Sequence, residues 1–269
     1  MTDAPHPFLR GLAPTLLIAH RGGAALWPEN TLVAFESARR DYNADVLELD
    51  VHATRDGELV VAHDPTLERC TDGEGPIAAL TYAELARLDA GYRFTRDGVS
   101  FPFRGRGVTV PRLADLLRAL AGARLNVELK PDVAGLEDAL AEVVGRADAW
   151  GRVCVGSEHD AAAERLVRAM PRACHFFPRE ALTAFVLSLK IGAEPPESPY
   201  QVLDMPLFYE GARLVEDAFL GECARRGRWV NVWTVNDANE MAALVAEGVG
   251  GIITDRPDLL AAALGRRAR

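Results

Sequence analysis

Short apolar runs alternate with helical patterns along most of the chain, and this alternation limits the fold more than any other feature of the sequence. Strand-like runs occur at residues 15–19, 46–51, 125–129, 152–155, 172–176, 200–203, 229–234 and 251–254. Helical patterns occur at residues 31–41, 110–121, 133–147, 160–169, 180–189, 211–225, 237–247 and 257–264. About eight strand–helix units in series are what a (β/α)8 TIM barrel needs. A doubly wound open sheet is the main alternative, but no GxGxxG motif follows any of these strands.

The length of the chain, 269 residues, is common for a single α/β barrel, so we predict one domain over residues 1–269. Residues 65–107 interrupt the alternation with glycines, aromatic residues and turn residues, and only residues 82–90 look helical. We therefore expect an insertion after the second strand, at about 65–107. This insertion either contributes to a functional site or is a surface excursion with no role beyond packing.

Charge and composition exclude several classes of function. The formal net charge is -9, which gives no basic face for nucleic acid or an anionic membrane. No stretch approaches membrane-spanning length and the N-terminal apolar run is too short for a signal peptide, so we expect a cytoplasmic protein without a membrane anchor. The four cysteines lack CxxC spacing, which argues against a zinc site or a disulfide framework. The oligomeric state cannot be predicted from these features.

Three carboxylates at strand ends form a candidate metal site. Glu48 and Asp50 are two residues apart on one strand, so both side chains leave the same face, roughly 6.6 Å apart. Glu128 lies near the end of another strand. Three carboxylates in a mostly apolar wall repel one another unless a cation holds them, and oxygen ligands favour Mg²⁺ or Ca²⁺ over zinc. The alternative is that each carboxylate pairs with an arginine or a lysine.

Three further residues are candidates for substrate binding. Lys130 follows Glu128 by two residues and can offer a point charge to an anionic group, whereas Arg21 can offer a planar fork. A salt bridge to a carboxylate is the alternative for either one. Trp233 lies near the end of a strand, where its indole could pack on a substrate or belong to the core.

Two histidines are candidates for proton transfer. His20 follows the first strand, and His63 follows a further strand at residues 58–62. An imidazole titrates near neutrality, so each ring can take up or release a proton during a reaction. A structural role is the alternative for each. Asn30 is predicted to cap the helix at residues 31–41, and Glu29 orients either Arg21 or a metal-bound water.

Taken together, these residues resemble the glycerophosphodiester phosphodiesterase family. The family pattern is met in order and at compatible spacing by His20-Arg21-Gly22-Gly23, Pro28-Glu29-Asn30-Thr31, Glu48-Leu49-Asp50 and His63-Asp64. It extends to residues 126–130 and more loosely to residues 230–236, so the resemblance covers most of the chain.

The resemblance implies a (β/α)8 barrel, one divalent cation, and hydrolysis of a small-molecule glycerophosphodiester to sn-glycerol 3-phosphate and an alcohol. It also implies that the insertion caps the barrel mouth on the substrate side. Two alternatives are open. A lysophospholipase D-type phosphodiesterase would need a longer apolar groove for an acyl chain. A non-catalytic phosphate-ester binding barrel would have no need of paired histidines.

Overall fold

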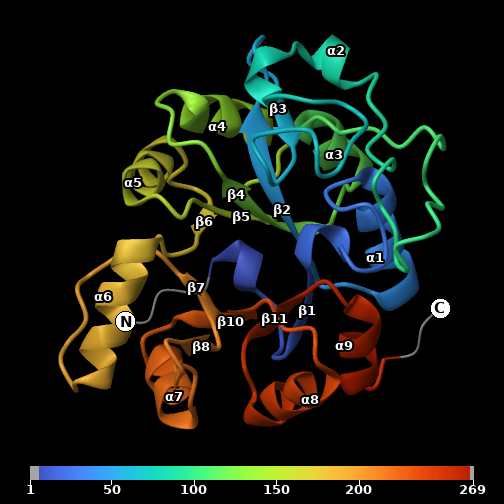
Figure 1. The fold of residues 1–269 in the computed structure, drawn as a ribbon. Helices are drawn as coiled ribbons and strands as arrows, with labels where there is room; N and C mark the ends of the chain where they lie inside the picture. The colour runs from blue at the N-terminus through green and yellow to red at the C-terminus, as the bar shows by residue number, and fades with distance from the viewer. Residues whose placement is uncertain (1–5, 267–269) are drawn as a thin grey trace.

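The structure is a computed structural model that describes residues 6–266, and its centre is a barrel of eight parallel strands (Figure 1). Around the barrel the strands follow the order β6-β5-β4-β2-β1-β11-β10-β7. Their bounds are β1 (Leu16–Ala19), β2 (Val46–Ala53), β4 (Arg124–Leu129), β5 (Val153–Gly156), β6 (Cys174–His175), β7 (Val202–Pro206), β10 (Trp229–Trp233) and β11 (Gly251–Thr254).

A parallel bridge between Phe176 and Val202 joins the two ends of this order. Beside it, the Phe177 amide donates to the Val202 carbonyl at 2.9 Å and the Gln201 amide donates to the His175 carbonyl at 2.8 Å. The (β/α)8 barrel prediction is therefore confirmed, and the open-sheet alternative is wrong.

The two faces of each strand pack into different cores. On β2, Leu47, Leu49 and Val51 point outward into the large cluster between the strands and the helices. Val46 points inward, into a smaller cluster inside the barrel. The surrounding helices are α1 (Leu32–Tyr42), α3 (Leu113–Ala119), α4 (Leu136–Arg146), α5 (Asp160–Ala169), α6 (Arg179–Lys190), α7 (Asp217–Arg225), α8 (Ala238–Glu247) and α9 (Pro257–Ala263). Among residues 6–266, no helix has both the length and the apolar character needed to cross a membrane.

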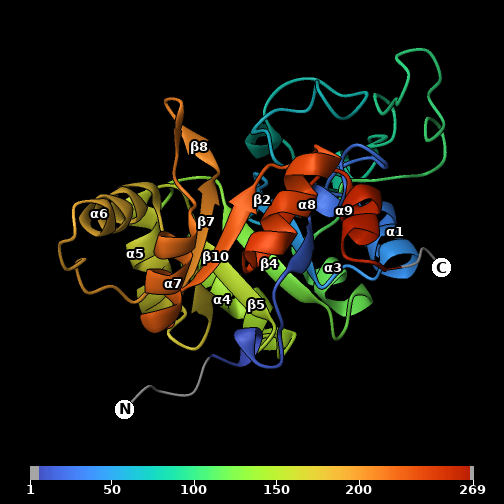
Figure 2. The same cartoon turned by 90° about the horizontal axis from the view of Figure 1, so that it is seen from below.

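The N-terminal segment closes one end of the barrel. A short 3-10 helix, Pro7–Leu9, places Phe8 and Leu9 in the inner cluster. His6 caps this helix: its Nδ1 atom accepts from the Phe8 amide at 3.1 Å, and its Nε2 atom lies 2.9 Å from the Arg172 carbonyl. The strands point away from this end, so their carboxyl ends form a mouth on the opposite side (Figure 2).

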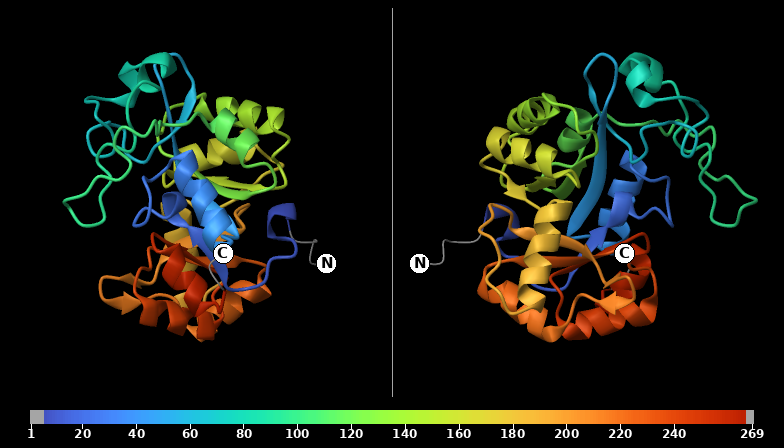
Figure 3. Two further views of the ribbon diagram at one scale, coloured as in Figure 1. Left: turned by 90° about the vertical axis from the view of Figure 1, so that its right-hand side faces the viewer. Right: turned by 60° about the vertical axis from the view of Figure 1, so that its left-hand side comes forward.

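Residues 65–107 follow β3 (Leu59–Val61), the predicted strand before His63, which pairs antiparallel with β2 and is not a barrel strand. The segment contains α2 (Tyr82–Leu85), shorter than predicted, and otherwise runs mostly as loop. It has a hydrophobic cluster of its own with Val60. Figures 2 and 3 show that it stands out from the barrel on the side of the mouth.

One predicted helix was wrong over its first part. Residues 211–225 were expected to be helical, but β8 (Phe208–Tyr209) and β9 (Ala212–Arg213) form a hairpin, and α7 begins only at Asp217. The two turn residues, Glu210 and Gly211, have positive φ angles of 49° and 81°. A two-residue turn of this kind matches the twist of a hairpin and excludes a helix.

Candidate active site

The loop after β1 carries the first two candidate residues, His20 and Arg21, to the barrel mouth. Its path depends on Gly22, which has a φ of 84°. A Cβ atom on Gly22 would lie 2.7 Å from the Cβ atom of Ala34, so only glycine lets this loop approach α1 so closely. The Asn30 amide then donates to the Arg21 carbonyl at 2.9 Å and ties the loop to the segment before α1.

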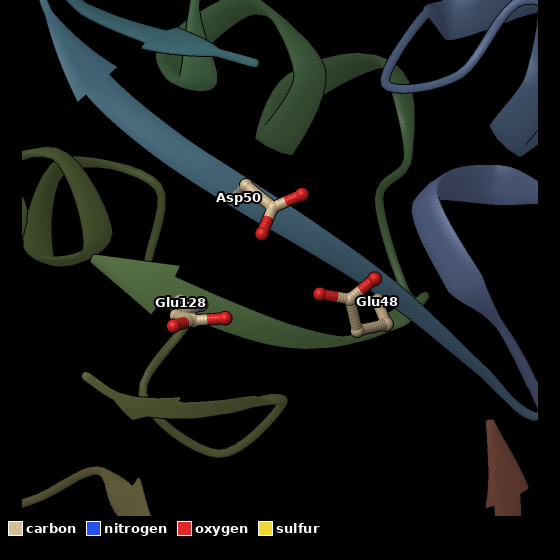
Figure 4. A group of neighbouring side chains, drawn as sticks. All are labelled: Glu48, Asp50 and Glu128. Carbon is tan, nitrogen blue, oxygen red and sulfur yellow. The ribbon is translucent and has the colours of Figure 1, made fainter. Parts of the chain in front are cut away.

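The three predicted metal ligands come together inside the mouth (Figure 4). Glu48, Asp50 and Glu128 each offer an oxygen, and these oxygens lie within 4.8 Å of one another. Asp50 and Glu128 are direct neighbours in the register of β2 and β4. Burial, together with the nearby charge of Asp50, raises the pKa of Glu48 to about 8. This position therefore favours the neutral form of Glu48 over its charged form.

Two basic residues lie against this group. The Lys130 Nζ atom is 3.2 Å from Asp50 Oδ1 and 3.0 Å from Glu128 Oε2. The Arg21 Nε atom is 3.4 Å from Asp50 Oδ2. The salt-bridge alternative thus accounts for Asp50 and Glu128. Glu48 instead accepts the Arg21 backbone amide at 2.9 Å and has His20 Nε2 at 3.9 Å.

Both histidines are held in the same way. His20 Nδ1 lies 2.6 Å from Asp255 Oδ1, and His63 Nδ1 lies 2.6 Å from Asp64 Oδ1. Because an ionised carboxylate can only accept, Nδ1 carries the hydrogen in each ring and Nε2 is the nitrogen left for chemistry. Burial lowers the pKa of His20, but the hydrogen bond that its ring donates to Asp255 and the charge of Glu48 outweigh it, so the pKa is raised.

The sequence prediction missed Asp255, although a signal was present. Ala19 and Thr254 are register partners at the ends of β1 and β11, so the next residue of each chain segment, His20 and Asp255, must emerge side by side. A barrel order with the first and last strands adjacent would have indicated this pair. Asn236 supports it, because its Nδ2 atom donates to Asp255 Oδ2 at 2.8 Å.

The segment before α1 differs from the prediction at Asn30. The residue that caps α1 is Thr31, whose side chain accepts from the Ala34 amide at 3.3 Å. Asn30 is buried, has a φ of 57°, and donates from Nδ2 to Asp50 Oδ2 at 3.0 Å. Glu29 accepts from Arg21 Nη1 at 3.0 Å, which is one of the two roles left open for it.

Trp233, the remaining candidate, ends β10 on the opposite side of the barrel from β4. Its side chain continues the inward face of β10, because Val230 and Val232 point outward into the large cluster. With 44% of its surface exposed, it belongs to the rim of the mouth rather than to the core.

The comparisons with known proteins agree with this architecture. The model of the "Glycerophosphoryl diester phosphodiesterase family" matches residues 20–259. A glycerophosphodiester phosphodiesterase of Caldanaerobacter subterraneus is 30% identical over 253 residues, covering 91% of this chain and 96% of the relative.

Two solved structures share the fold. The glycerophosphoryl diester phosphodiesterase domain of a Mycobacterium tuberculosis protein is 25% identical, with a TM-score of 0.81, and the match covers 93% of this chain and 98% of that one. An Oleispira antarctica phosphodiesterase, solved in complex with the product sn-glycerol-3-phosphate, is 23% identical, with a TM-score of 0.70, and the match covers 94% and 97%. The chain therefore belongs to the glycerophosphoryl diester phosphodiesterase family and is a phosphodiesterase.

Proposed function

We propose that this enzyme hydrolyses small-molecule glycerophosphodiesters to sn-glycerol 3-phosphate and an alcohol, with one divalent cation and two histidines that transfer protons. The observation that carries the proposal is that three carboxylates lie together beside the imidazole of His20, which Asp255 holds. His63, held by Asp64, comes from the segment beside them, because the backbone amide of Ala62 donates to the Asp50 carbonyl at 3.0 Å. The phosphodiesterase that was solved with sn-glycerol-3-phosphate has the same fold and supports the choice of product.

The residues fit a hard divalent cation. Glu48, Asp50 and Glu128 supply only oxygen, the donor that Mg²⁺ and Ca²⁺ prefer. Burial and the charge of Asp50 raise the pKa of Glu48, and a cation beside these carboxylates would oppose both effects. A bound cation would also supply electrostatic stabilisation to the phosphoryl oxygens.

The basic residues fit the anionic substrate. Lys130 and Arg21 now neutralise Asp50 and Glu128, so a cation bound there would free them for phosphate oxygens. We assign the phosphate to these two residues. We assign the rim contact to Trp233, whose exposed indole offers an apolar face to the glycerol carbons or the head group.

His20 and His63 move the protons. One ring takes a proton from the nucleophile at Nε2, and the other gives a proton to the leaving oxygen, also from Nε2, since both Nδ1 atoms are held by carboxylates. The nucleophile is either water or the glycerol 2-hydroxyl. In the second case the hydroxyl oxygen displaces the alcohol and forms a cyclic phosphate, which water then opens to sn-glycerol 3-phosphate.

Turnover of glycerophosphocholine tests the proposal. We expect hydrolysis that EDTA abolishes and that Mg²⁺ or Ca²⁺ restores. Glu128→Gln should need more metal for half-maximal activity because it removes a ligand charge, whereas Glu142→Gln, on the exposed face of α4, is the matched control. Full activity in metal-free buffer, with no ion found by elemental analysis, would remove the cation from the mechanism.

The same assay separates the alternatives. Preferential cleavage of lysophosphatidylcholine would identify a lysophospholipase D-type activity. Binding of glycerophosphocholine without turnover at any metal concentration would favour a binding protein. Family membership favours the enzyme.

A further inference from the structure

Arg69 joins two carboxylates of the candidate site with one side chain. It lies at the start of residues 65–107, and its Nε atom donates to Asp64 Oδ2 at 2.5 Å. Its Nη1 and Nη2 atoms donate to Glu29 Oε2 at 2.5 Å and Oε1 at 2.8 Å. All three guanidinium nitrogens are therefore engaged, in the forked geometry that arginine offers and lysine lacks.

Each of these carboxylates also holds a residue assigned to the reaction. Asp64 uses its other oxygen for His63 Nδ1, at 2.6 Å. Glu29 accepts from Arg21 Nη1 at 3.0 Å. Arg69 is thus linked to the His63 imidazole through Asp64, and to the Arg21 guanidinium, which we assign to the phosphate, through Glu29.

We propose that Arg69 is a positioning residue that orients His63 through Asp64 and Arg21 through Glu29. The proposal rests on the function proposed above. It assigns to the insertion a role at the site, because the guanidinium comes from the first residues of that segment.

Burial and exposure explain why the two carboxylates need this support. The His63 side chain is 33% exposed and Asp64 is 28% exposed, so neither is fixed by packing alone. Glu29 is only 14% exposed, and a buried carboxylate with a single partner would be costly. Arg69 supplies the second partner for both.

The link from Arg69 through Asp64 and the link through Glu29, called here the Asp64 arm and the Glu29 arm, predict different kinetic effects. Losing the Asp64 arm should lower kcat, because a misplaced proton donor or acceptor costs up to about 10²-fold in rate. Losing the Glu29 arm should raise KM, because Arg21 is assigned to the phosphate. Asp64→Asn should therefore lower kcat with little change in KM, whereas Arg69→Gln should change both.

The experiment compares wild type, Arg69→Gln, Arg69→Lys, Arg69→Ala, Asp64→Asn and the double variant Arg69→Gln/Asp64→Asn on glycerophosphocholine. We expect the double variant to lose no more kcat than the worse single variant, since both act on His63 through one path. Guanidinium ion added to Arg69→Ala should restore part of the activity, whereas it should not help Asp64→Asn. Arg106→Gln is the control, because Arg106 lies in the same segment and is exposed, with no side-chain ion pair recorded within residues 6–266.

A second readout does not depend on turnover. In ¹⁵N NMR spectra of the imidazoles, His63 of the wild type should hold its hydrogen on Nδ1, whereas Arg69→Gln should show a mixture of tautomers. Should Arg69→Gln fail to fold, Arg69→Lys serves in both measurements.

The outcomes separate this proposal from the proposed function. Absence of wild-type turnover contradicts the function, while the NMR tautomers still decide the role of Arg69. Suppose that the wild type turns over and that Arg69→Gln keeps the same kcat, KM and His63 tautomer but melts at a lower temperature. Arg69 would then be a structural ion pair and not a positioning residue. Additive losses in the double variant would mean that Arg69 does not act through Asp64.

Discussion

At the scale of the residue, the two histidines are alike in one respect and different in another. Both present Nε2, because Nδ1 of each ring is held by a carboxylate. Their surroundings differ, since His20 is 18% exposed and faces Glu48 at 3.9 Å, whereas His63 is 33% exposed and belongs to the Arg69 network through Asp64. We therefore expect the two rings to take different steps of the proposed reaction.

This difference leads to a prediction with two substrates. His20→Ala and His63→Ala should each lose about 10²–10⁴-fold in turnover of glycerophosphocholine, the usual size of a proton-transfer contribution. The variant that lacks the acid should recover much of its loss on a nitrophenyl phosphodiester, because nitrophenolate leaves without a proton. Steady-state rates on both substrates decide the assignment. Equal losses on both substrates for both variants would show that neither ring is the leaving-group acid.

How far the sequence predicts such residues depends on where their partners lie. The metal-ligand candidates could be predicted because Glu48 and Asp50 share one strand and the third carboxylate ends another. Asp255 and the ion pair between Arg69 and Glu29 were missed, because their partners lie 235 and 40 residues away along the chain. Contacts at that separation follow from the closed order of the strands and from the course of the insertion.

At the scale of the element, apolar strands were predicted well and turns poorly. Strands such as β1 and β11 were found because each is buried on both faces and reads as a short, mostly apolar run. The apolar residues of β2, also buried on both faces, are interrupted by Glu48 and Asp50. The helix expected to begin at Gly211 does not form there, because Glu210 and Gly211 have positive φ angles that a right-handed helix cannot contain. The cap of α1 was placed one residue early, since Asn30 and Thr31 are both good caps and only the tertiary contact with Asp50 separates them.

The loop from β1 to α1 gives a stability prediction. Gly22→Ala should lower the free energy of unfolding by roughly 2–5 kcal/mol, from overpacking against Ala34 and from a left-handed backbone at φ 84°. Gly57→Ala is the control, because Gly57 has a φ of 82° but no atom within 4 Å of the added Cβ. It should lose only the backbone part, about 1–2 kcal/mol. Urea unfolding measures both, and equal losses would show that close packing on α1 is unimportant.

At the scale of the whole molecule, the insertion is attached to the barrel by charge as well as by packing. A hydrophobic cluster joins it to Val60, and the Arg69 guanidinium joins it to Glu29. The single-domain organisation, the cytoplasmic location and the binding roles at the mouth stay predictions. The barrel itself could be predicted from the sequence because eight strand–helix units leave few other arrangements.

The charged attachment predicts how stability depends on pH. The hydrogen bond from Arg69 lowers the pKa of Asp64. For Glu29, burial alone would raise the pKa, but the hydrogen bonds and charges of Arg69 and Arg21 outweigh it, so this pKa is lowered as well. Groups whose folded pKa is depressed stabilise the fold fully above their unfolded pKa, near 4, and lose that contribution as the pH falls through the folded pKa. Wild type should therefore lose stability steeply below about pH 4.

The matched variant isolates this effect. Without Arg69, the pKa values of Asp64 and Glu29 move back toward or above their unfolded values, so Arg69→Gln should differ most from wild type above pH 5, and the difference should shrink at pH 3. Urea unfolding from pH 6 to pH 3 measures it, with Arg106→Gln as the control that should follow wild type throughout. Because Arg69 is 45% exposed, high salt should also reduce the difference. A difference that stays constant from pH 6 to pH 3 would mean that Arg69 stabilises the molecule by packing and not by its carboxylate partners.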